Sequence, residues 1–231
     1  MAYITAERNA ATSLSKALEF VDADDATSGK FVVGQAKYHG QWKTREAALP
    51  MLLNSFHDQT ETPVRFASEN VALESPRIFD LPFLYMTGHQ TFELTEKERQ
   101  NLRQYLQRGG VLFAEACCGR EAFDASFRSE IRRVFPDRQL VQVPRNHPVF
   151  LFPNRLETVK PTPALARQLD TAGDIPPTLL GITIDGTLGV VYSPRGLACG
   201  WELAQCPYGK GVASKDALAL GVNILTYSVL Q

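Results

Sequence analysis

Short apolar runs alternate with longer helical segments between residues 31 and 143, and this order restricts the fold more than any other feature of the sequence. Each apolar run has the length of a strand buried on both faces, and each intervening segment is long enough for a crossover helix. Strands separated by such helices predict an α/β fold with a mostly parallel sheet and right-handed crossovers. The expected strands are Phe31–Ala36, Val64–Phe66, Phe83–Met86, Val111–Glu115 and Leu140–Val143.

The segments between these strands carry helix signals. In the clearest one, Thr95–Arg108, Thr95 and Glu98 have the spacing of a capping box, and two glycines follow the last turn. The other helices are expected at Thr44–His57 and Arg120–Val134.

The chain changes character after residue 143. Prolines interrupt residues 144–178, and the Asp185-Gly186 pair between Leu179–Ile184 and Leu188–Tyr192 is typical of an antiparallel hairpin. A further strand is expected at Leu197–Trp201, and Ser214 is expected to cap a buried last helix that ends at Leu230.

Residues 1–29 are expected to lie outside the main domain. Thr5–Val21 has helical spacing, and an acidic linker follows it, so this region is interpreted as a helix and linker that could be the remnant of a preceding domain. Residues 30–231 are then expected to form one α/β domain.

Composition excludes several classes of function. The chain has 24 Lys+Arg against 25 Asp+Glu, and its net charge of -1 gives no basic field for nucleic acid or anionic lipid. No apolar run approaches the roughly 20 residues that span a membrane. The four cysteines are too few and too irregularly spaced for a disulfide scaffold, so a cytoplasmic protein with free thiols is expected.

Candidate site residues follow the expected strands. Ligands of open parallel sheets bind at the carboxyl ends of the strands, and small-molecule sites mix aromatic walls with a few polar groups. A ligand-binding crevice is therefore expected at this edge, with Glu202 as a further polar contact. The residues at the strand ends are Tyr38, His39, Trp42, His89, Glu115, Cys117 and Arg120.

Cys117 lies at the expected junction between a strand and a helix. The positive end of a helix favours a thiolate there, and Gly119 allows the tight turn that a nucleophile requires. The alternative is that Cys117 and Cys118 are small buried residues that fill the junction. Cys199 and Cys206 are expected to be structural, because their spacing does not suit a compact zinc loop.

Several short motifs occur in the order found in a known family. Together, over residues 31–230, they resemble a bacterial family called domain of unknown function 4159, within the class I glutamine amidotransferase-like superfamily. The resemblance implies a flavodoxin-like parallel sheet flanked by helices, with an antiparallel hairpin extension, and it implies no activity. It also places Cys117 at the position of the amidotransferase nucleophile. The motifs are Lys37-Tyr38 with Trp42, Asp80-Leu-Pro-Phe-Leu-Tyr85, Leu102-Arg-Gln-Tyr-Leu-Gln-Arg-Gly-Gly110, Val134-Phe-Pro136, His147-Pro148, Cys199-Gly-Trp-Glu202 and Gly221-Val-Asn-Ile224.

The standard amidotransferase triad is rejected. That class has a His-Pro-Glu-type base far downstream of its cysteine, and no histidine follows His147 in this chain. A Cys117–His89 dyad with Glu115 nearby remains an alternative, because the strands that precede these residues are joined by one crossover helix and could be neighbours. A metal site built from His39, His89, Cys117 and Glu115 is a weaker alternative.

Three functions remain open. The first is a non-catalytic module that binds an unknown small ligand or protein, with no cofactor and no metal assigned. The second is a cysteine-dependent hydrolase or amidase in which Cys117 attacks, His89 is the base and Arg120 stabilises an oxyanion. The third is an architectural domain of a larger bacterial protein. The sequence leaves the oligomeric state open.

Overall fold

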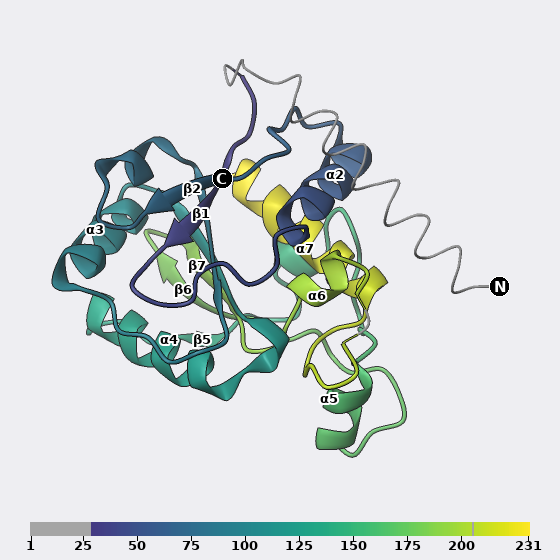
Figure 1. Ribbon diagram of the computed structural model, residues 1–231. Coiled ribbons are helices and arrows are strands. Elements are labelled where there is room, and N and C mark those ends of the chain that lie inside the picture. The colour runs from purple at the N-terminus through teal and green to yellow at the C-terminus, as the bar shows by residue number, and fades with distance from the viewer. Residues whose placement is uncertain (1–28, 205) are drawn as a thin grey trace.

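The computed structural model describes residues 29–204 and 206–231, so the helix and linker expected before residue 29 lie outside the described residues. Within these residues, seven strands form one sheet in the order β2-β1-β3-β4-β7-β6-β5 (Figure 1). The strands are β1 Val33–Lys37, β2 Glu69–Ala72, β3 Phe83–Gly88, β4 Val111–Ala116, β5 Val141–Gln142, β6 Leu180–Ile184 and β7 Thr187–Ser193.

The sheet has a parallel part and an antiparallel extension, as the sequence predicts. Strands β2, β1, β3, β4 and β7 run parallel, whereas β6 pairs antiparallel with β7 and β5 pairs antiparallel with β6. Every residue of the central strands β3 and β4 is buried, which explains their continuous apolar runs. The carboxyl ends of the parallel strands therefore meet at one edge of the sheet.

Helices cover both faces of the sheet (Figure 1). One face packs against α3 and α4 through buried residues such as Leu102 and Phe127, and the other packs against α2, α6 and α7 through residues such as Leu52, Trp201 and Leu220. None of these helices is long and apolar enough to cross a lipid bilayer, as far as residues 29–204 and 206–231 are concerned. The helices are α2 Ala48–Thr60, α3 Glu96–Gln107, α4 Glu121–Val134, α5 Pro163–Gln168, α6 Ala198–Trp201 and α7 Ser214–Val229.

The predicted capping box of α3 is confirmed. The Thr95 hydroxyl accepts from the Glu98 backbone N–H at 3.1 Å, and the Glu98 carboxylate accepts from the Thr95 N–H at 2.8 Å. The other Glu98 oxygen accepts from the backbone N–H of His39 at 3.0 Å. This contact ties the start of α3 to the loop that follows β1.

Two of the predicted strands are wrong. Leu197–Trp201 contains the helical turn α6 instead, because the buried Glu115 carboxylate binds the backbone N–H groups of Leu197 and Ala198 and turns the chain there. Val64–Phe66 is no strand either, since only Val64 forms a single bridge, to Phe31. The strand in that region is the more polar β2, which lies at the sheet edge and so lacks a continuous apolar run.

Other predicted elements differ in their bounds, pairing or capping, and the helix expected at Thr44–His57 is α2 Ala48–Thr60. Leu140–Val143 becomes the short outer strand β5, which pairs antiparallel with β6 and not with the parallel strands. Helix α7 begins at Ser214 and has Ala213 as its N-cap residue, with no side-chain cap. Burial of its first turns against α2 and α6 replaces the stabilisation that a cap would supply.

Candidate functional site

All four cysteines of the chain meet at the carboxyl edge of the sheet, and we call this group the thiol cluster. Cys117 and Cys118 follow β4, Cys199 lies on α6 after β7, and Cys206 lies in the loop after α6. The Sγ atom of Cys118 is 3.2 Å from that of Cys199 and 4.0 Å from that of Cys117. The Sγ atoms of Cys118, Cys199 and Cys206 all lie within 4.8 Å of one another.

The backbone around Cys118 holds this geometry. Cys118 has φ 56° and ψ 17°, a left-handed conformation that costs energy for any residue with a side chain and is often found at functional sites. Its carbonyl accepts from the Lys210 N–H at 2.9 Å, which brings the loop after Cys206 against it. Gly196, which follows β7, packs so closely that an added Cβ would lie 2.6 Å from the Cys118 nitrogen. The three loops can therefore meet only because position 196 has no side chain.

Arg45 is the cation that faces the thiol cluster. Its Nη2 atom donates to the Sγ of Cys206 at 3.5 Å and to the Sγ of Cys118 at 3.8 Å. Its Nη1 atom contacts a carboxylate oxygen of Glu202 at 3.4 Å, and the other Glu202 oxygen accepts from the Ala47 N–H at 3.1 Å. Glu202, a sequence candidate for ligand contact, thus holds Arg45 and its loop toward the sulfurs.

These contacts separate the pKa values of the thiols. Hydrogen bonds from Cys117, Cys199 and His89, with a further one from Arg45, hold the pKa of Cys118 well below its usual range against the opposing effect of burial. The hydrogen bond to Cys118, together with burial, raises the pKa of Cys117, although the contact with Cys199 acts in the opposite direction. Hydrogen bonds to Cys117 and Cys118, together with burial, raise the pKa of Cys199. The cluster therefore favours one thiolate, on Cys118.

The structure brings His89 and Cys117 together as the sequence suggests, but Cys117 is fully buried. The ring nitrogen of His89 and the sulfurs of Cys117 and Cys118 lie within 4.8 Å of one another. The side chain of Cys117 faces the interior, whereas Cys118 and His89 are both partly exposed and line a pocket of about 390 Å³. Cys118 is therefore the thiol of this turn that solvent and ligands can reach.

Glu115 is fully buried and binds backbone and side-chain donors. Its carboxylate accepts hydrogen bonds from the Tyr85 hydroxyl at 2.8 Å, from the Thr87 hydroxyl at 3.2 Å, and from the N–H groups of Leu197 and Ala198. Burial raises the pKa of Glu115, although these four donors act in the opposite direction. Glu115 therefore fixes the start of α6, the turn that carries Cys199.

The other aromatic and basic candidates lie outside the thiol cluster. Tyr38 is buried against Phe92, at 4.7 Å between ring centroids, and its hydroxyl donates to the Thr87 carbonyl at 3.0 Å. His39 is exposed, and Trp42 is half-buried.

Arg120 shares a pocket with one thiol of the cluster. It is exposed at the start of α4, where it lines the 390 Å³ pocket together with Cys118 and His89. It can therefore meet a group bound beside the Cys118 thiol.

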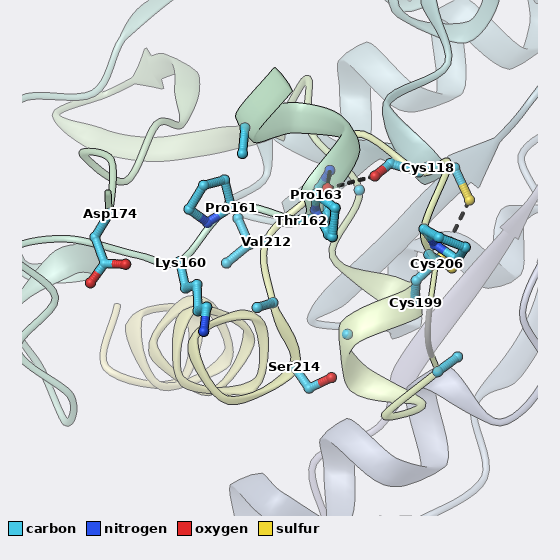
Figure 2. Close-up of a pocket in the computed structure, with 18 of the residues that line it drawn as sticks. Cys118, Lys160, Pro161, Thr162, Pro163, Asp174, Cys199, Cys206, Val212 and Ser214 are labelled. Atoms are coloured by element: carbon cyan, nitrogen blue, oxygen red, sulfur yellow. Dashed lines mark hydrogen bonds between the residues drawn. The ribbon is translucent and has the colours of Figure 1, made fainter. Parts of the chain in front are cut away.

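A larger cavity of about 530 Å³ is lined by three thiols of the cluster. Figure 2 shows Cys118, Cys199 and Cys206 together at one end of it and Lys160 and Asp174 toward the other. Its remaining walls are mostly apolar and come from the proline-rich segment and from the loop before α7. Among the lining residues are Pro161, Pro163, Ala166, Ala172, Gly200 and Val212.

The sequence missed three members of this site. The sequence predicts only a structural role for Cys199 and Cys206 and does not single out Arg45, because no local spacing connects them with Cys118. The one usable signal is the motif Cys199-Gly-Trp-Glu202, which contains both a thiol of the cluster and the carboxylate that holds Arg45.

The site lies inside a recognised family domain. The model of the family described as domain of unknown function (DUF4159) matches residues 32–229. The chain belongs to the DUF4159 family. This match confirms the family that the motifs indicate, and no curated protein matches the chain. The DUF4159 region includes all strands of the described sheet, the thiol cluster and Arg45, so the cluster is part of the family domain and not an appendage.

Proposed function

We propose that this DUF4159 domain is a binding module whose small ligand occupies the 530 Å³ cavity, with one end against the thiols of Cys118, Cys199 and Cys206. The observation that supports this proposal is the size and lining of the cavity. Its volume lies within the range of about 300–1,000 Å³ that is usual for small-molecule sites, and its walls are mainly apolar with few polar groups, as in such sites.

The charged groups of the cavity indicate what the ligand carries. Among the described residues, neither the Lys160 ammonium nor the Asp174 carboxylate has an ion-pair partner, and both are exposed at the side of the cavity away from the thiols. A free amino acid with an apolar side chain would suit this site, because its carboxylate can pair with Lys160 and its ammonium with Asp174. A short carboxylic acid would pair with Lys160 alone.

The finer classification of the fold is part of this proposal. The parallel order β2-β1-β3-β4-β7 corresponds to the 2-1-3-4-5 order of flavodoxin-like sheets, which bind ligands at the carboxyl edge. This order supports the flavodoxin-like, glutamine amidotransferase-like assignment. The four free thiols support a reducing, cytoplasmic location.

Filling the cavity is expected to abolish ligand binding. The experiment screens amino acids and short aliphatic carboxylates by thermal shift and saturation-transfer NMR against three forms of the protein: the wild type, Ala166→Trp and Ala125→Trp. Ala166 lines the cavity on α5, whereas Ala125 is an exposed alanine on α4 and is the matched control. Compounds that bind the wild type and Ala125→Trp should not bind Ala166→Trp. A panel without any binder, or binding that survives in Ala166→Trp, would contradict the proposal.

The turn at Cys118 favours a second candidate, a cysteine-dependent hydrolase or amidase. Cys118 combines a left-handed backbone, a lowered pKa and a neighbouring His89 in the 390 Å³ pocket, where Arg120 could stabilise an oxyanion. The nucleophile proposed from the sequence, Cys117, is buried, so this version assigns the attack to Cys118.

Removal of the Cys118 thiol is expected to abolish any esterase activity. With p-nitrophenyl acetate, the Cys118 thiolate would form a thioester and release p-nitrophenolate, and water would then hydrolyse the thioester. We expect Cys118→Ser to lower the rate by at least about 100-fold, because removing a nucleophile that forms the covalent intermediate leaves only residual catalysis. Cys117→Ser, next to it, should keep most of the rate. Equal rates in the two variants and in buffer would eliminate the enzyme candidate.

A further inference from the structure

We propose that Cys118, Cys199 and Cys206 form a binding site for one thiophilic divalent cation, with Zn²⁺ as the expected ion. The inference goes beyond the proposed ligand-binding function, because the metal ion would be held by the protein whether or not an organic ligand fills the cavity.

The spacing of the three sulfurs is close to that of thiolate ligands around a tetrahedrally coordinated ion. A Zn–S bond of about 2.3 Å places the sulfurs of a tetrahedral site roughly 3.8 Å apart. The Cys118–Cys199 distance is 3.2 Å, and all three sulfurs lie within 4.8 Å of one another. To reach this spacing, the Cys118–Cys199 separation must grow by about 0.6 Å, and a separation at the 4.8 Å limit must shrink by about 1 Å.

The three thiols come from separate elements that the fold holds together. Cys118 is fixed by the turn after β4, and Cys199 by α6, whose start is bound by Glu115. The Cys206 carbonyl accepts from the Gly209 N–H at 3.1 Å, and the next residue, Lys210, donates to the Cys118 carbonyl. The backbone thus sets the positions of the three ligands in advance.

Arg45 supplies the charge balance that such a site requires. Three thiolates carry three negative charges, which one divalent cation and the Arg45 guanidinium neutralise. Arg45 already donates to Cys118 and Cys206, in the manner of the outer hydrogen bonds that orient metal ligands.

The fourth coordination position would face the cavity. Cys118, Cys199 and Cys206 all line the 530 Å³ cavity, whereas Cys117 and His89 are not among its lining residues. Three protein ligands with one open position are typical of zinc sites that bind a water molecule or a ligand atom, and closed sites with four protein ligands are typical of structural zinc. The alternative group of His89, Cys117 and Cys118 shares only Cys118 with this site. Among the described residues, Arg45 donates to neither His89 nor Cys117.

Cobalt spectroscopy tests the proposal directly. The full chain, reduced and stripped of metal with a chelator, is titrated with Co²⁺ and then with Zn²⁺ in competition with a chromophoric chelator. We expect one Co²⁺ per chain, with near-ultraviolet thiolate-to-cobalt charge-transfer bands and visible bands of a tetrahedral ion, and displacement of Co²⁺ by Zn²⁺. Absence of thiolate bands with folded, fully reduced protein would overturn the proposal.

Variants identify the ligands. Cys206 lies on a partly exposed loop, so Cys206→Ser should fold, and it should weaken Zn²⁺ binding by more than about 100-fold, since even outer-shell changes cost 10–100-fold. Arg45→Met should weaken Zn²⁺ binding by about 10–100-fold, as expected for an outer-shell change. Arg120→Met is the control for this variant. Cys117→Ser should retain both affinity and spectrum. If Cys117→Ser abolishes binding while Cys206→Ser does not, the assigned ligand set is wrong.

The cavity-filling variant separates this proposal from the proposed function. Ala166→Trp changes the cavity wall and none of the three thiols, so it should still bind one Zn²⁺ per chain. Loss of organic ligands with retained metal binding supports both proposals. Retained binding of organic ligands in a protein that binds no metal would overturn the metal site alone.

Discussion

Replacing Glu115 by leucine is expected to lower the free energy of unfolding by roughly 3–5 kcal/mol, since buried donors that lose their acceptor cost about 1–3 kcal/mol each. The Tyr85 and Thr87 hydroxyls and the N–H groups of Leu197 and Ala198 all lose the same carboxylate. No water can replace it without a rearrangement, because the Glu115 side chain is fully buried. Urea denaturation followed by far-ultraviolet circular dichroism measures the loss.

Glu115→Gln is the matched control. The amide keeps the size of the side chain, and its oxygen can still accept from the two backbone N–H groups while its NH₂ group donates to the hydroxyl oxygens. A loss of about 1 kcal/mol is therefore expected. If the leucine variant is as stable as the glutamine variant, the carboxylate does not hold the start of α6.

The difference in stability between the wild type and Glu115→Gln is expected to depend on pH. Because burial raises the pKa of Glu115, its carboxyl group keeps its proton to a higher pH in the folded protein than in the unfolded chain. The resulting stabilisation is fully present below the ordinary glutamate pKa of about 4.3 and is lost as the pH rises through the raised value. The advantage of the wild type over Glu115→Gln should therefore shrink as the pH rises from about 4 to neutrality. An advantage that grows over this range would contradict the raised pKa.

Trp201→Ala is the second variant with a large expected effect, a loss of roughly 3–5 kcal/mol. Trp201 is fully buried, lies 5.5 Å from the Tyr85 ring and 6.0 Å from the Phe113 ring, and donates from Nε1 to the Ala217 carbonyl at 2.9 Å. Truncation leaves a large cavity between the sheet and α7 and removes the hydrogen bond to the Ala217 carbonyl, so both losses add.

Trp42→Ala is the comparison for the tryptophan prediction. Trp42 is only half-buried, so its truncation should cost about 1 kcal/mol, near the average for point substitutions. Denaturant midpoints of the two variants, measured by circular dichroism, give the comparison. Similar losses in both variants would mean that α6 is not anchored by Trp201.

The predictions for Glu115 and Trp201 both concern α6, the turn that carries Cys199. They therefore connect the stability of the fold with the proposed metal site. Glu115 binds the start of α6 and Trp201 buries its end. Variants at either position should therefore displace Cys199 and weaken Zn²⁺ binding in any fraction that remains folded. The buried carboxylate that sequence reasoning offered as a catalytic group thus acts in the structure by positioning a thiol.

Local patterns predicted most of the regular structure. The continuous apolar runs of β3 and β4 arise because both faces of these strands are buried, and the capping box of α3 is a contact between residues three apart. Patterns failed where a distant group decided the conformation. The segment that begins at Leu197 has the composition of a strand, but the carboxylate of Glu115, 82 residues earlier, binds its N–H groups and turns it into α6.

By itself, the sequence determined the α/β class, the hairpin after the proline-rich segment and the position of the adjacent cysteines at a strand end, because each depends on the burial periodicity or turn chemistry of neighbouring residues. Only the tertiary structure decided that Cys199, Cys206 and Arg45 join Cys118. The reason is the order of the strands: β7 lies next to β4 in the sheet although two strands separate them in the chain, and no local pattern encodes that placement. It results from packing of the whole domain, which brings thiols 81 residues apart into contact.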